Sequence, residues 1–259
     1  MSGLGGLWAA TYRPGPMRTL VLGHTGMVGR RVAERLARRG DDVGGIGSVF
    51  APASAGHAVT AVAAEHGARR IVLLSGRRDE AAAPVERAVR DAVAAWTIVR
   101  TSLLDQCFSE GCLLDPVRTG SLELPVPPVG EPFVDADDVA DVAIAALTEA
   151  GHAGRVYELT GPRLLTFAEA VEEIVAAARR PIRYARVATG RPGSLRADRA
   201  AWLRNMVDGR NACLADGMRR ALGREPRDFA DFARDAAASG VWRTPPTTMR
   251  STNEGHPVP

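Results

Sequence analysis

The stretch RTLVLGHTGMVGRRVAERLARRG, residues 18–40, decides the fold class of this chain. A short apolar run is followed by the spacing GxxGxxG at Gly23, Gly26 and Gly29, and then by apolar residues at helical spacing up to Gly40. This pattern predicts a strand, a tight turn and a helix. Glycines let such a turn approach a pyrophosphate, and the helix N-terminus offers unpaired N–H donors and a positive dipole end. We therefore expect a dinucleotide-binding loop, with a purely structural turn as the alternative.

Strand and helix patterns continue to alternate along the chain. Buried strands are expected at residues 70–74, 96–99 and 156–160, and helices at 58–66, 82–95, 135–147 and 166–178. Such alternation calls for a parallel sheet with helices on its faces, which is a Rossmann-like, doubly wound α/β fold. Thr166 and Glu169 form a capping-box pattern at the start of the last of these helices. Residues 103–128 read as an irregular loop, rich in proline toward its end, over a binding cleft.

The composition excludes several kinds of catalytic site. The chain has 259 residues, 46% of them hydrophobic, enough for one α/β unit with a small appended region. All 33 basic residues are arginine, so a Schiff-base lysine, a Walker-type lysine and a Tyr-x-x-x-Lys pair are excluded. The formal net charge of +3 comes from arginines interspersed with acidic residues, which does not favour nucleic-acid binding.

The three cysteines and the hydropathy indicate a cytoplasmic protein without a metal site. Cys107, Cys112 and Cys213 have no His or Cys partner at zinc spacing, so we expect reduced, buried thiols. The first 16 residues lack the features of a signal peptide, and no segment reaches the length of a membrane span.

Beyond the glycine loop, six motifs carry a resemblance to a known family. They are RIVLLS at 70–75, VERAV at 85–89, WTIVR at 96–100, PFVDADDVA at 132–140, YELTGP at 157–162 and LGREPRDFA at 222–230. In order and spacing they resemble NmrA-like, atypical short-chain dehydrogenases/reductases, and the likeness covers roughly residues 17–243.

The resemblance implies an organisation and an activity. Residues 17–165 would form a shortened nucleotide-binding core, and 166–243 a smaller, mainly helical substrate-side region, with 103–130 as a cleft loop. Residues 1–16 would be a flexible extension and 244–259 a disordered tail. The implied activity is the NADPH- or NADH-dependent reduction of a quinone-like or aromatic natural-product molecule. The alternatives are a cofactor-independent cyclisation or coupling step in bacterial secondary metabolism, and a non-enzymatic sensor or assembly protein.

The same resemblance nominates site residues. Those implied to bind the cofactor are Gly23, Thr25, Gly26, Met27, Val28, Gly29, Phe50, Ala51, Ser75, Thr101 and Ser102. Weak catalytic candidates are Ser75, Glu86 and Gln106. Ser75 lies where related enzymes place a catalytic serine, but the helix after it contains no tyrosine, so we favour a hydrogen-bonding strand end over a proton donor. Glu86 stands four residues before Arg90 and suits a helical ion pair.

A gap after the first helix departs from the family. A strand–helix–strand unit needs about thirty residues, and residues 40–49 are too few. The strand tip that reads the adenosine ribose is then missing, apart from Asp41 and Asp42, which precede it. Either residues 42–44 form a short remnant, or stub, of that strand and the glycines that follow lead the chain back across the sheet, or another subunit completes the sheet edge. An uncovered edge at the first strand would invite pairing, so we predict a homodimer.

Overall fold

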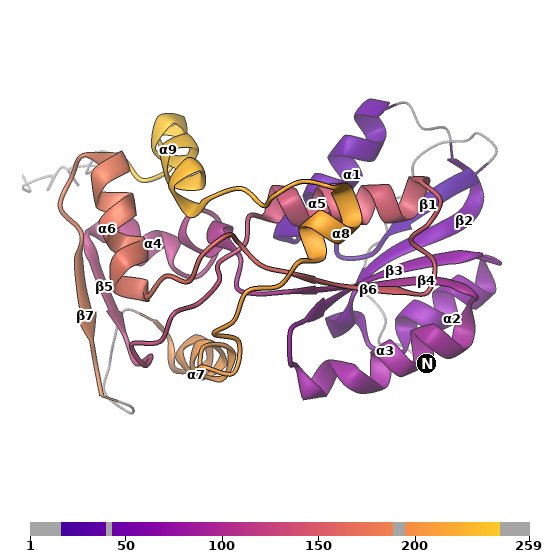
Figure 1. Cartoon of the computed structure of the whole chain (residues 1–259), viewed down its shortest axis with the longest axis horizontal. Coiled ribbons are helices and arrows are strands. Elements are labelled where there is room, and N and C mark those ends of the chain that lie inside the picture. The colour runs from indigo at the N-terminus through magenta and orange to yellow at the C-terminus, as the bar shows by residue number, and fades with distance from the viewer. Residues whose placement is uncertain (1–16, 40–42, 189–194, 244–259) are drawn as a thin grey trace, which may run out of the picture.

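The main sheet of the computed structural model has five parallel strands, and the structure describes residues 17–39, 43–188 and 195–243. The strand order is β1-β2-β3-β4-β6 (Figure 1). The strands are β1 Met17–Val21, β2 Val43–Pro52, β3 Arg70–Gly76, β4 Ala95–Thr101 and β6 Arg155–Leu159. This parallel sheet with helices on both faces confirms the predicted Rossmann-like α/β class.

Two pairs of helices cover the two faces of the sheet (Figure 1). Helices α1 (Met27–Arg39) and α5 (Ala136–Thr148) pack on one face, where Val72 and Val99 of the central strands meet them. Helices α2 (Ala58–Glu65) and α3 (Ala83–Ala92) pack on the other face, against Ile71, Leu73 and Ile98. The alternation of these side chains between faces follows from the two-residue period of a strand.

Strand β2 corrects the expectation for the gap. No separate stub exists: the described residues from Val43 onward form one strand that lies between β1 and β3. Its pairing with β1 starts irregularly, because Met17, Arg18 and Thr19 pair with Val43, Ile46 and Ser48 in turn. Extra residues in one strand produce bulges, which glycine tolerates well. The glycines at 44, 45 and 47 therefore serve the bulges of a real strand. Asp41 and Asp42 lie outside the described residues, as do 1–16 and 244–259.

The connections between the strands of this sheet do not all have the same hand. All consecutive strands of this sheet step in the same direction, so the face covered by each connecting helix determines the hand of the connection. Helices α1 and α5 cover the face opposite to α2 and α3, so the β1–α1–β2 connection, like the return through α5 to β6, has the opposite hand to β2–α2–β3 and β3–α3–β4. Parallel crossovers almost always share one hand. Removal of the units that normally follow α1 accounts for this exception, since α1 keeps its face while the chain moves to the other side of β1.

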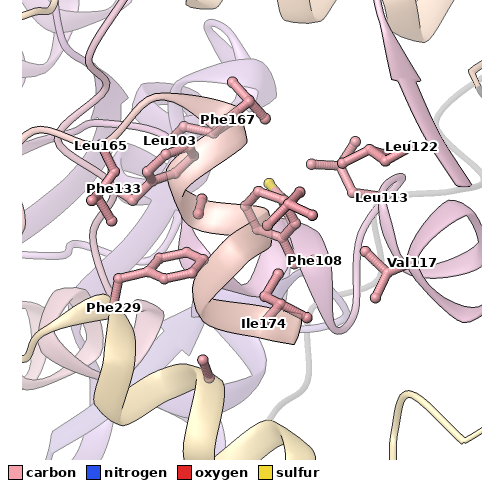
Figure 2. Close-up of a cluster of buried hydrophobic side chains, with 14 of the residues drawn as sticks. Leu103, Phe108, Leu113, Val117, Leu122, Phe133, Leu165, Phe167, Ile174 and Phe229 are labelled. Atoms are coloured by element: carbon pink, nitrogen blue, oxygen red, sulfur yellow. The ribbon is translucent and has the colours of Figure 1, made fainter. Parts of the chain in front are cut away.

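A second lobe lies beyond the carboxyl ends of the strands (Figure 1). Its elements are η3 (Asp105–Phe108), α4 (Leu114–Thr119), β5 (Ser121–Leu124), α6 (Phe167–Ala178), β7 (Arg183–Arg186), α7 (Ala197–Met206) and α9 (Phe229–Ser239). Strands β5 and β7 pair in parallel. Figure 2 shows the aromatic centre of this lobe, where Phe108 meets Phe133, Phe167 and Phe229 with ring centroids 5.5–5.9 Å apart.

Residues 103–128 are therefore not the irregular cleft loop that the sequence suggested. They contain η3, α4 and β5, and Leu103, Phe108, Leu113 and Leu122 are buried in the core of the second lobe. Burial of apolar side chains overrides the loop-like composition here. The predicted capping box at Thr166 and Glu169 is present, and no helix among the described residues is long and apolar enough to cross a membrane.

Candidate active site

The glycine loop has the geometry that a phosphate cradle requires. It joins the carboxyl end of β1 to α1, and Gly23 has a φ of 71°, which glycine adopts without strain. A Cβ on Gly29 would lie 2.2 Å from the carbonyl oxygen of Gly23, so only glycine fits. Gly26 donates its N–H to that same carbonyl at 2.9 Å. The first turn of α1 then presents backbone N–H groups at the exposed tip formed by Thr25 and Gly26.

The other residues predicted to bind the cofactor, in the loop and on β2, contribute mainly backbone. Val28 and Ala51 are buried with their side chains in the hydrophobic core, and Met27 packs against the core of the second lobe. The backbone of Phe50 pairs with Val21 and Val72 in the sheet. Side chains at these positions are thus not the recognition elements that a phosphate would meet.

Ser75 and Glu86 belong to a buried polar network on the α3 side of the sheet. Ser75 Oγ donates to Glu86 Oε1 at 2.8 Å, and Arg100 donates to both Glu86 oxygens at 2.9 and 2.6 Å. Burial raises the pKa of Glu86, but the hydrogen bonds from Arg100 and Ser75 outweigh it and hold this pKa below its ordinary value. Arg90 adds a contact at 3.4 Å, so the expected helical ion pair is present but secondary to Arg100.

Thr101 and Ser102 end β4 next to a buried arginine. Arg77, 2% exposed, follows β3 and donates through Nη1 to Ser102 Oγ at 3.2 Å and to the carbonyl of Cys213 at 3.1 Å. Its Nε donates to Glu158 on β6 at 3.3 Å, and its backbone N–H donates to the carbonyl of Thr101 at 3.0 Å. One guanidinium thus ties the ends of β3, β4 and β6 to the segment around Cys213.

Glu131 lies beside these residues and completes what we name the Arg77 cluster, namely Arg77, Ser102, Glu131, Glu158 and Cys213. Its carboxylate is 2% exposed and accepts the N–H of Leu103 at 3.3 Å. Burial raises the pKa of Glu131 to about 7, against the opposing effects of the Leu103 N–H and the charge of Arg77. This carboxyl group therefore changes its charge near neutral pH.

Gln106 occupies a structural position. Its Oε1 accepts the N–H of Ala136 at 2.7 Å and its Nε2 donates to Asp135 at 3.1 Å, which secures the start of α5. Asp135 caps the same helix by accepting the N–H of Asp137. The neighbouring Asp105 is fully buried, and neither of its carboxylate oxygens has a hydrogen-bond partner. Burial, reinforced by the charges of nearby aspartates, holds the pKa of Asp105 well above its ordinary value.

A cavity of about 590 Å³ opens at the carboxyl ends of β3 and β4, within the size range of ligand pockets. It lies next to the Ser75–Glu86–Arg100 network and the start of α3. Its lining is charged: Gly76, Arg78, Asp79, Glu80, Ala83, Glu86, Arg100 and Arg210.

The structure brings only some of the predicted residues together. Gly23 through Gly29 form one loop, Thr101 and Ser102 join the Arg77 cluster, and Ser75 and Glu86 join the network under α3. The sequence analysis missed Arg77, Glu131 and Cys213. A charged residue directly after a buried strand was a usable signal for Arg77. Its contact with Cys213, 136 positions away, had no local signal.

Comparisons with known proteins identify oxidoreductases among the relatives of this chain. The chain is 30% identical over 199 residues to the uncharacterized oxidoreductase YesF of Bacillus subtilis (68% of this chain, 66% of that protein). It is 32% identical over 168 residues to an NAD(P)H azoreductase of Xenophilus azovorans (60% and 57%). The chain thus spans less than two thirds of the length of these relatives. No family model matches it.

The fold also matches solved reductase structures. The Escherichia coli NADPH-dependent quinone oxidoreductase, solved with NADPH, superposes with a TM-score of 0.67 at 16% identity, covering 84% of this chain and 98% of that one. The predicted resemblance is therefore confirmed: the chain is a relative of NAD(P)-binding oxidoreductases and has the NmrA-like, atypical short-chain dehydrogenase/reductase fold.

Proposed function

We propose that this chain is an NAD(P)H-dependent reductase of aromatic, quinone-like small molecules. The observation that carries the proposal is the glycine loop, where Gly29 admits no Cβ and Gly23 needs a positive φ. Such constraints fit a loop that receives a pyrophosphate at the N-terminus of a helix. The names of an azoreductase relative and of a structurally similar quinone oxidoreductase support both the cofactor and the substrate class.

The residues present fit one part of the dinucleotide better than the other. The pyrophosphate would rest on Gly23–Gly29, and the nicotinamide end would face Thr101 and Ser102 at the end of β4. The adenosine ribose is normally read by the tip of a strand on the far side of β1. Among the described residues β1 is the edge strand, so this contact has no counterpart. Affinity must then come mainly from the phosphates and the nicotinamide end.

In this reaction the protein itself has to position the cofactor and the substrate. The bound cofactor would supply the hydride, and the chain would hold a flat acceptor against it and admit a proton from water. The charged cavity beside Gly76 is the space we assign to the substrate. Its mixed charges suit an acceptor that carries polar substituents.

Titration calorimetry with NADPH and NADH tests the proposal. We expect binding in the micromolar range, about −8 kcal/mol, and a rise in the unfolding temperature with ligand. Gly26→Glu places a carboxylate at the exposed tip of the loop and should abolish binding. Ala64→Glu adds the same charge on the exposed side of α2 and is the matched control. Absence of binding up to millimolar nucleotide would refute the reductase.

A second candidate is a cofactor-independent relative that performs a cyclisation or coupling step, or acts as a sensor. The edge position of β1, and with it the missing ribose-reading strand, favours this alternative. Turnover of a substrate without any nicotinamide would identify the enzyme. A partner that binds only when a ligand is present, with no turnover, would identify the sensor.

We also propose a cytoplasmic homodimer whose nucleotide part is residues 17–165 and whose substrate side is 166–243 with 103–130. The cysteines are free thiols, as a reducing compartment requires. One side of β1 is unpaired within the described part of the chain, so two copies could join their sheets there. Light scattering across a tenfold dilution series measures the mass; a single-chain mass throughout would contradict the dimer.

A further inference from the structure

A basic groove lies on the second lobe, away from the glycine loop. It opens between the carboxyl ends of α6 and α9, which run side by side in Figure 1. Its volume is about 360 Å³, enough for a small metabolite. The groove is lined by Ala177, Ala178, Arg179, Arg180, Arg234, Ala237, Ala238, Trp242 and Arg243.

The charges of the groove are unbalanced. Four of its lining residues are arginines and none is acidic. Arg234 contacts Asp231, and each of the two helix carboxyl ends contributes about half a negative charge. About two positive charges therefore remain without a counterpart among these groups. By contrast, the three arginines of the cavity beside Gly76 are matched by Asp79, Glu80 and Glu86.

Two of the four arginines differ in how firmly they are held. Arg180 donates through Nη2 to the carbonyl of Val117, which fixes its guanidinium, while its Nε is buried with no hydrogen-bond partner. Arg179 ends α6 in the left-handed region, with a φ of 52°, and its side chain is exposed. The exposed Arg179 and Arg243 are therefore the side chains that an arriving ligand can reach.

The remaining wall of the groove is apolar. Four alanines and Trp242 form it, and the indole Nε1 of Trp242 already donates to the carbonyl of Phe108 at 2.8 Å. The polar contacts of a ligand must therefore come from the arginines. A ligand with one doubly charged group and a compact carbon body matches both surfaces.

We infer that this groove binds a small metabolite through a phosphate monoester. The arginines would hold the phosphate dianion, for which guanidinium groups are well suited, and the alanine and tryptophan wall would contact the carbon part. The groove belongs to the α6–α9 side of the second lobe, so it is a different site from the predicted pyrophosphate cradle. The inference does not depend on the proposed reductase activity.

Inorganic phosphate is the probe for this site. At pH 8 and constant ionic strength, phosphate replacing chloride should raise the unfolding temperature, with saturation below about 20 mM. Arg179→Asn with Arg243→Gln should weaken the phosphate affinity at least about tenfold, since Asn tolerates the left-handed backbone. Arg69→Gln with Arg87→Gln removes two exposed arginines elsewhere and should leave the affinity unchanged.

Gly26→Glu separates the groove from the glycine loop. The phosphate response should survive this substitution. A response lost in Gly26→Glu but kept in the groove variant would locate the phosphate at the loop and overturn the inference. Equal weakening in the groove variant and in the control pair, or no response beyond that of chloride, would overturn it as well.

Discussion

The glycine loop and the Arg77 cluster stand at the same edge of the sheet but are built in opposite ways. The loop offers backbone N–H groups from one short stretch, and the side chain of Val28 is turned into the core. The Arg77 cluster consists of side chains gathered from β3, β4, β6 and the Cys213 segment. The loop thus requires positions without side-chain atoms, whereas the cluster requires particular charged side chains.

This difference predicts how each region fails. Added side-chain volume should distort a loop built from backbone, whereas a changed charge on a neighbouring residue should leave its conformation unchanged. A cluster built around one buried guanidinium is damaged by lost charge, because removing one partner leaves the others buried and unpaired. Substitutions that test these two failures separate the regions.

The largest expected effect is that of Arg77→Ala. It leaves Ser102 and the carbonyl of Cys213 without the Arg77 guanidinium and leaves Glu158 with Arg100 alone, so we expect the free energy of unfolding to fall by about 3 kcal/mol. Glu158 is partly exposed, which keeps the loss at the lower end of the range for buried pairs. Chemical denaturation measures it. Arg78→Ala, at the adjacent exposed arginine, is the control, and its unfolding free energy should change by no more than about 0.5 kcal/mol. Equal losses of stability in the two variants would contradict a special role of Arg77.

Gly29→Ala tests the loop by volume alone. The added Cβ would lie 2.2 Å from the Gly23 carbonyl oxygen, so the loop must move, at about 2–3 kcal/mol of unfolding free energy. Nucleotide binding should weaken more than this loss of stability explains. Gly67→Ala is the control for backbone strain, because its φ is positive and its Cβ would meet no atom within 4 Å. A harmless Gly29→Ala would contradict the loop geometry.

Glu131 makes the stability of the cluster depend on pH. Since its pKa is about 7 in the folded chain and lower in the unfolded chain, the folded state holds the proton more tightly, and the unfolding free energy falls as pH rises from about 4.5 to 7. At about 1.4 kcal/mol per pKa unit, the fall amounts to about 1–3 kcal/mol. Glu131→Gln should remove it and be the more stable protein at pH 8. Parallel pH profiles for both proteins would rule out this assignment.

Ser75→Ala should have the smallest effect. The hydroxyl donates one hydrogen bond to a Glu86 that Arg100 still holds, so we expect a loss of about 1 kcal/mol in unfolding free energy. Reductase turnover should fall by less than about threefold, because Ser75 supplies no proton in this scheme. A loss of a hundredfold or more in kcat with unchanged stability would instead make Ser75 catalytic.

The sequence predicted the regions whose signals are local. The strand, loop and helix of residues 18–39, the helices α2, α5 and α6, and the capping box at Thr166 follow from periodicity and hydrogen-bonding residue types. Strand β2 was mistaken for a stub, because three glycines weaken a strand pattern and only its two neighbours in the sheet stabilise it.

Long-range contacts account for the rest. Strand β7 and the helices within 103–128 become visible only when the second lobe's core is assembled from distant segments. The Arg77 cluster is of the same kind: no periodicity relates Arg77 to Glu131 or Cys213. Asp105 also carried no signal, since its burial without partners runs against the usual exposure of aspartate.

The reversed hand of the β1–α1–β2 connection bears on the order in which the chain folds. The units β2–α2–β3 and β3–α3–β4 share one hand and can form progressively from local neighbours, whereas α1 must pack on α5, about a hundred positions away. We therefore expect the first strand and helix to dock late and to exchange their amide hydrogens sooner than β3 and β4. The glycine loop lies within this late-docking unit. A nucleotide bound there would therefore stabilise the docked position of the strand and helix that fold last.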